Sequence, residues 1–166
     1  KGYSLNNQSV SDDFVSGPSK PVSYLGKVAS LLYERYLYGQ KPIAMVSTDN
    51  CSHNGDKLYE AMNAFATNWA KNNKAEKGFV DYVNDKSKVS FPWSMIDKIT
   101  PRPDKHVKEM LSGIEGIDGL VTSKNTYIAP FVNSEESEYL VIEDWFPNGR
   151  PNLEKAGVLF TDRETV

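Results

Sequence analysis

The sequence predicts an α/β fold, and three of its features lead to that prediction. Apolar residues recur every three or four positions in two long segments, a spacing typical of amphipathic helices. Short apolar runs stand between the helical segments and are consistent with buried strands. A dense polar segment, VSTDNCSHNGDKL at residues 46–58, directly follows the first of these runs. Helices that alternate with buried strands indicate a layered α/β structure.

The elements can be taken in chain order. Residues 4–21 are polar, contain Gly17, Pro18 and Pro21, and are predicted to form a loop. Helices are expected at residues 22–38, 58–69, 75–84 and 104–111, and strands at residues 43–46, 89–92, 139–142 and 158–160. Gly39 stands where a helix commonly ends. Residues 94–101 fit neither pattern clearly.

Composition excludes several functional classes. The 166 residues carry 19 basic and 22 acidic side chains, a net charge of −3, and no basic run, so no nucleic-acid partner is expected. No apolar run approaches the roughly 20 residues that span a bilayer, so no membrane partner is expected either. The single cysteine, Cys51, cannot form an internal disulfide, which favours a cytoplasmic protein. The chain contains no GxGxxG dinucleotide fingerprint.

The polar segment after the first strand is the main candidate site. Ligands of open α/β sheets bind beyond the carboxyl ends of strands, where the Asn50 amide could donate a hydrogen bond to a substrate oxygen. The alternative is a turn that caps the next helix. Asp97, between Ile96 and Ile99, is either a partly buried site carboxylate or a salt-bridge or capping residue. His53 has no second histidine near it in the sequence, so no metal site is expected.

Four segments occurring in this order carry a family resemblance: KGYSL, PIAMVSTDNCSHNGDKL, VSFPWSMIDKITP and YLVIEDWFPNGRPNLEKAGVLFTD. Together they resemble the polyol-specific long-chain dehydrogenases, the family of mannitol 2-dehydrogenase, fructuronate reductase and tagaturonate reductase. The CDN of the family pattern is Thr48-Asp49-Asn50 here, with the cysteine displaced to position 51.

The resemblance implies a fold and a set of site residues. Residues 1–166 would be a single piece, the later part of a Rossmann-type cofactor domain with the passage towards a helical C-terminal domain, and both flanks would be missing. Asn50 and Asp97 would be catalytic, Asp49 and Asp97 would contact an NAD or NADP cofactor, and no metal would take part. Asn50 and Asn54 would contact the substrate.

The expected function follows from this resemblance. The chain would be a fragment of an NAD(P)-dependent oxidoreductase that interconverts a ketose or keto-hexuronate with its polyol or hexonate, with fructuronate and mannonate favoured over fructose and mannitol. Its partners would be a small sugar or polyol and the missing flanking domains of its own parent chain. The isolated fragment would be inactive, because the family's nucleotide loop and catalytic lysine fall outside it. The alternative is a non-catalytic sugar- or nucleotide-binding module on the same fold.

Overall fold

The computed structural model describes residues 2–97, 104–114, 122–123, 126–127, 134, 136 and 138–166. The protein is a mixed α/β structure, as the sequence predicts. It divides into two compact units, Lys1–Ile96 with Leu140–Val166, and Asp97–Tyr139. The second unit contains the predicted helix at residues 104–111, which is α5 (Lys105–Met110). It also contains β4 (Thr122–Ser123), which pairs antiparallel with β5 (Thr126–Tyr127).

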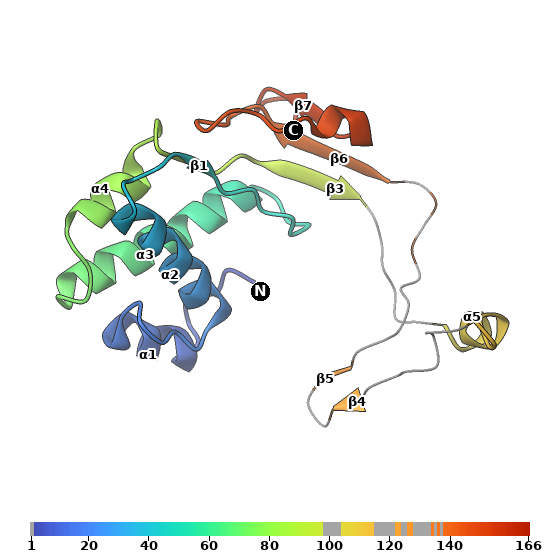
Figure 1. Ribbon diagram of the computed structural model, residues 1–166, viewed down its shortest axis with the longest axis horizontal. Coiled ribbons are helices and arrows are strands. Elements are labelled where there is room, and N and C mark those ends of the chain that lie inside the picture. The colour runs from blue at the N-terminus through green and yellow to red at the C-terminus, as the bar shows by residue number, and fades with distance from the viewer. Residues whose placement is uncertain are drawn as a thin grey trace. The chain divides into compact units, whose positions relative to one another are not determined.

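Helices α1 (Gln8–Ser16), α2 (Tyr24–Leu37), α3 (Asn54–Lys71) and α4 (Gly78–Asn84) form a helical cluster in the first unit (Figure 1). The last three confirm the helices predicted from apolar spacing. Ser23 caps α2 by accepting a hydrogen bond from the backbone N–H of Gly26 at 3.0 Å. The cluster packs around a fully buried aromatic core of Phe65, Trp69 and Phe79.

Helix α1 corrects the prediction that residues 4–21 form a loop. The segment is polar, yet its Asp13 side chain is only 1% exposed. Asp13 accepts hydrogen bonds from the backbone N–H groups of Val22 at 2.9 Å and Ser23 at 2.8 Å. The Asp13 carbonyl accepts a further bond from the indole of Trp69 at 2.8 Å. These tertiary contacts fix a helix that local sequence preference alone does not reveal.

The first unit contains two small sheets. β1 (Ile43–Ala44) pairs in parallel with β2 (Val89–Ser90), so the strands expected at residues 43–46 and 89–92 are present but shorter. β3 (Ser94–Asp97), β6 (Tyr139–Glu143) and β7 (Leu159–Thr161) form a sheet in the order β3-β6-β7, with β6 and β7 parallel. The ambiguous segment at residues 94–101 therefore supplies β3, and its last four residues lie outside the described residues.

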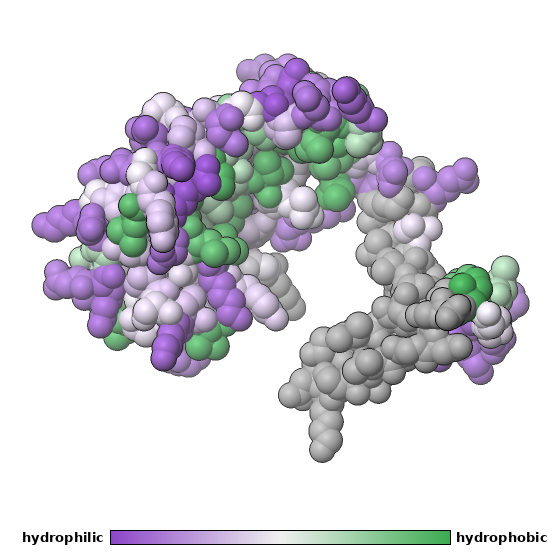
Figure 2. All heavy atoms as spheres, viewed as in Figure 1, coloured by the Kyte–Doolittle hydropathy of each residue, from purple (hydrophilic) through white to green (hydrophobic). Residues whose placement is uncertain are grey.

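Polar and apolar side chains separate on the surface of the first unit. The face of the helical cluster visible in Figure 2 is mostly hydrophilic. Apolar side chains, among them Val46, Leu140, Ile142 and Phe146, line a groove beside the strands. In the described ranges no helix combines the length and the hydropathy that a membrane span requires.

Candidate functional site

The polar segment between β1 and α3 divides into an exposed rim and a buried anchor. The rim consists of Thr48, Asp49 and Asn50, which are all exposed and follow the buried Ser47. The anchor is Asn54, the first residue of α3, which is 1% exposed. One short stretch of sequence thus has two physical roles.

Asn54 joins the rim to β3 through hydrogen bonds. Its amide nitrogen lies 3.0 Å from the Asp49 carbonyl and 2.9 Å from the Ser94 carbonyl, both acceptors. Its amide oxygen accepts from the backbone N–H of Ser94 at 3.0 Å. Because a buried polar group must be paired to avoid a desolvation penalty, this arrangement fixes the loop that carries Asn50.

A second hydrogen-bonded chain supports the rim from beneath. The Ser94 hydroxyl donates to the Ser47 carbonyl, and the Ser47 hydroxyl is bonded to the phenol of Tyr3. The backbone N–H of Asp49 donates to the same Ser47 hydroxyl at 3.2 Å. Burial raises the pKa of the Tyr3 phenol, the hydrogen bond with Ser47 partly offsets this rise, and the nearby Asp49 and Cys51 add to it. Tyr3 therefore stays neutral near pH 7.

A cavity of about 300 Å³ opens beside this rim. Its lining residues come from the polar segment, from the start of β3 and from the end of the chain: Asn50, Cys51, Ser52, His53, Asn54, Trp93, Ser94, Met95 and Val166. Within the described residues the Asn50 side chain makes no hydrogen bond with protein atoms. Its amide is therefore available to a ligand in the cavity.

Trp93 forms an aromatic wall of this cavity. The His53 ring stacks on it with the centroids 4.4 Å apart and the planes 20° apart. His53 itself adopts the left-handed backbone conformation, with φ 55° and ψ 41°, as it leads into α3. The Trp93 Nε1 is buried, and no group in the described part of the chain accepts its hydrogen bond. The wall therefore holds an unused donor.

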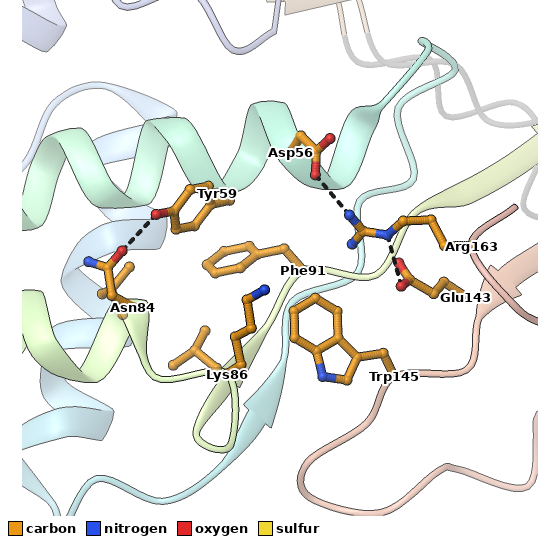
Figure 3. Close-up of a pocket in the computed structure, with 10 residues that line it drawn as sticks. Asp56, Tyr59, Asn84, Lys86, Phe91, Glu143, Trp145 and Arg163 are labelled. Carbon is orange, nitrogen blue, oxygen red and sulfur yellow. Dashed lines mark hydrogen bonds and ion pairs between the residues drawn. The ribbon is translucent and has the colours of Figure 1, made fainter.

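A separate cavity of about 690 Å³ lies next to Arg163 (Figure 3). Figure 3 shows the Arg163 guanidinium between Asp56 of α3 and Glu143 of β6. Its nitrogens lie 3.4 Å from the Asp56 carboxylate and 2.9 Å from the Glu143 carboxylate. The aromatic side chains of Tyr59, Phe91 and Trp145 also line this cavity, together with Val83, Asn84, Lys86 and Val89.

The structure brings some of the predicted site residues together. Asn50 lies at the first cavity, with Asp49 next to it at the rim. Asn54 also borders that cavity, although its amide hydrogen bonds are directed into the protein. Asp97 ends β3 and is exposed, so of its two alternatives the structure does not show a partly buried carboxylate. The roles assigned to these four residues stay predictions.

Two residues that the sequence reading did not select belong to this region. Trp93 forms a wall of the first cavity. Arg163 contacts Asp56, which lies 107 positions earlier in the chain, and no local pattern signals such a contact. In the described ranges no three His, Cys, Asp or Glu side chains gather as metal ligands. The chemistry that the site offers is hydrogen bonding to a hydroxyl or carbonyl oxygen.

The chain is similar in sequence to known oxidoreductases. The D-mannonate oxidoreductase of Thermotoga maritima is 52% identical over the whole chain, which covers 32% of that protein. The polyol:NADP oxidoreductase of Gluconobacter oxydans is 32% identical over 98% of the chain, which covers 30% of that protein. The chain therefore spans about a third of the length of these relatives.

A solved structure shows the same likeness in three dimensions. The ternary complex of Pseudomonas fluorescens mannitol 2-dehydrogenase with NAD and D-mannitol aligns with 97% of this chain at a TM-score of 0.68 and 32% identity. The alignment covers 29% of that structure. The sequence pattern of the family described as "Mannitol dehydrogenase Rossmann domain" matches residues 13–155. The chain thus belongs to the mannitol dehydrogenase Rossmann domain family.

Proposed function

We propose that this chain is part of an NAD(P)-dependent oxidoreductase that interconverts a ketose or keto-hexuronate with its polyol or hexonate. The observation that carries the proposal is the 52% identity to a D-mannonate oxidoreductase over the whole chain. The free amide of Asn50 at the mouth of a cavity is consistent with it. On this proposal the chain is the later part of the cofactor domain and leads towards a helical domain.

Asn50 would act on the oxygen of the reacting carbon. Its amide N–H would donate a hydrogen bond to that oxygen and stabilise the negative charge that develops there during the reaction. Asn54 would hold the loop so that this amide points at the cavity, through its bonds to Asp49 and Ser94. Asp97 would be the second catalytic residue, and its exposure at the end of β3 leaves the carboxylate accessible.

The residues present could bind a ribose of a dinucleotide cofactor but not its pyrophosphate. The exposed Asp49 carboxylate could accept a hydrogen bond from a ribose hydroxyl, and Asp97 could do the same. The sequence lacks the glycine-rich loop that binds pyrophosphate, so on this proposal the phosphates are held outside this chain. When bound, the nicotinamide accepts or supplies the hydride.

We propose the fructuronate/mannonate pair as the favoured substrate, ahead of fructose and mannitol. The basis is the similarity to the Thermotoga maritima protein, whose name specifies mannonate. A cytoplasmic location, where nicotinamide cofactors and reduced thiols coexist, agrees with the single free thiol of Cys51.

The test is NADH and NADPH oxidation by the full-length protein that carries this chain. Fructuronate, tagaturonate and fructose are offered separately, with the 166-residue chain as the control. We expect rapid oxidation with fructuronate and none by the chain alone. Oxidation with fructose only would change the substrate assignment. No oxidation with any of the three would overturn the proposed activity and favour a binding role.

A variant tests the role of Asn50 directly. Asn50→Ala in the full-length protein should lower kcat about 10²–10³-fold, because one oxyanion donor typically contributes about 3–4 kcal/mol. Its unfolding temperature should stay close to that of the wild type, because Asn50 is exposed and makes no hydrogen bond within the described residues. Wild-type kcat in a correctly folded variant would show that Asn50 does not contact the reacting oxygen.

A further inference from the structure

We propose that Arg163 is a positioning residue for the candidate site. It would hold the Trp93 indole in place, and the indole would in turn hold the His53 ring beside Asn50. The kinetic part of this proposal rests on the proposed function, whereas its structural part does not.

Arg163 joins two elements of the first unit, β6 and α3, and two tryptophan side chains. Its Nε lies 2.9 Å from the Glu143 carboxylate at the end of β6, and its second nitrogen lies 3.4 Å from the Asp56 carboxylate in the first turn of α3. Its guanidinium carbon lies over the rings of Trp93 at 4.8 Å and Trp145 at 5.7 Å. A planar guanidinium can form ion pairs along its edge while its face stacks on an aromatic ring.

Two flat groups contact the Trp93 ring. The His53 ring lies 4.4 Å from the Trp93 ring and nearly parallel to it, and the Arg163 guanidinium lies 4.8 Å over the ring. The Trp93 backbone N–H is also fixed, because it donates to Glu143 at 3.0 Å. Glu143 therefore anchors both the tryptophan and the arginine that covers it.

The position of His53 depends on this stack. His53 is exposed, and its side chain makes no hydrogen bond with the described residues. The flat contact with Trp93 is what orients the imidazole at the cavity that Asn50 also lines. If the guanidinium is removed, the Trp93 ring loses this contact, and the indole and the imidazole gain freedom to move.

The chain offers a matched control in Arg150. This residue also pairs with two carboxylates, Asp144 at 2.7 Å and Glu154 at 3.0 Å. It also lies over one aromatic ring, that of Phe160 at 4.9 Å, and its exposure is similar to that of Arg163, 42% against 38%. Arg150 lines neither of the two cavities described above. Arg150→Ala therefore removes comparable surface interactions without touching the stack.

The structural test is an NMR measurement on the 166-residue chain. Its two histidines, His53 and His106, give separate imidazole signals. The ring current of Trp93 should shift the His53 signal upfield in the wild type. We expect Arg163→Ala to reduce this shift and Arg150→Ala to leave it unchanged. An unchanged His53 signal in a folded Arg163→Ala chain would overturn the proposal. If Arg163→Ala does not fold, Arg163→Lys replaces it, because lysine keeps the charge but lacks the planar group.

The kinetic test uses the full-length protein. Arg163→Ala should lower kcat on the order of ten- to hundredfold, the range expected when a site group is misplaced, while the KM for NADH changes little. Arg150→Ala should leave kcat within about twofold of wild type. Added guanidinium ion should restore part of the Arg163→Ala activity, whereas ammonium ion should not. Equal kcat for the two variants would refute the proposal. An inactive wild type would refute the proposed function instead, and the NMR result would still decide the role of Arg163.

Discussion

Replacing Asn54 by alanine tests whether this residue is mainly an anchor for the site. The substitution removes the amide that bonds the Asp49 and Ser94 carbonyls and leaves the buried backbone N–H of Ser94 without its 3.0 Å partner. Each hydrogen bond contributes about 1 kcal/mol, and an orphaned buried group costs about 1–3 kcal/mol. We therefore expect a loss of about 3–5 kcal/mol in the free energy of unfolding.

This loss is measurable as a change in the thermal unfolding temperature. For a chain of this size about 1 kcal/mol lowers Tm by about 2–4 °C, so circular dichroism should show a decrease of about 6–20 °C. Asn54→Asp should be at least as damaging, because it places an acceptor oxygen against the Asp49 and Ser94 carbonyls. Asn50→Ala is the control and should stay within about 0.5 kcal/mol of wild type, as expected for an exposed side chain.

The two roles assigned to Asn54 predict different results. An anchor predicts a large fall in Tm for Asn54→Ala, whereas a residue that only contacts substrate predicts a raised KM and an unchanged Tm. A fall of less than about 2 °C would refute the reasoning from hydrogen bonds. A double-mutant cycle with Ser94→Ala adds a further check, because bonded partners should show a coupling energy of about 0.5–3 kcal/mol.

Two further predictions concern packing and pH. A Cβ added at Gly55 would lie 2.3 Å from the Phe91 carbonyl oxygen, so Gly55→Ala should lower the free energy of unfolding in urea by at least about 3 kcal/mol. A Cβ added at Gly39 meets nothing within 4 Å, so the control Gly39→Ala should lower it by only about 1 kcal/mol, through backbone strain. Equal losses for the two variants would contradict this reasoning. Burial raises the pKa of Tyr36 and Tyr82, and the Glu76 hydrogen bond raises that of Tyr36 further. The resulting stabilisation is fully present below about pH 10 and is lost as the pH rises through the pKa values of the folded state. Tm should therefore fall above about pH 10, and it should fall less in Tyr36→Phe. A Tm that is constant from about pH 9 to 11 would refute this.

The sequence predicted the elements whose apolar pattern is strong. Helices α2, α3 and α4 were expected because their buried residues recur at helical spacing, and Phe65 and Trp69 are both fully buried. The parallel pairing of β1 with β2 agrees with the short apolar runs that were read as buried strands. These elements could be predicted because their apolar pattern and their burial agree.

Elements stabilised by long-range polar contacts could not be predicted. Helix α1 has a polar sequence and owes its packing to the buried Asp13, whose partners include Ser23 and Trp69, the latter 56 positions later. Arg163 is a similar case, since its partner Asp56 lies 107 positions earlier in the chain. A single sequence contains no local signal that pairs such residues. In the sequence, Asp13 and Arg163 do not differ from other charged residues.

In the candidate site, too, the sequence alone does not show which residues make long-range contacts. The sequence marks residues 47–54 as unusually polar, but it does not separate the groups that face a ligand from those that hold the loop. Burial separates them: Asn50 is exposed at the cavity, whereas Asn54 is 1% exposed and bonded on both sides of its amide. An exposed donor can be aimed accurately only if its loop is rigid, because a displacement of about 1 Å can reduce a rate about 10²-fold. If Asn50 has the proposed role, the polar density of this segment follows from the support that the residues around it give to its amide.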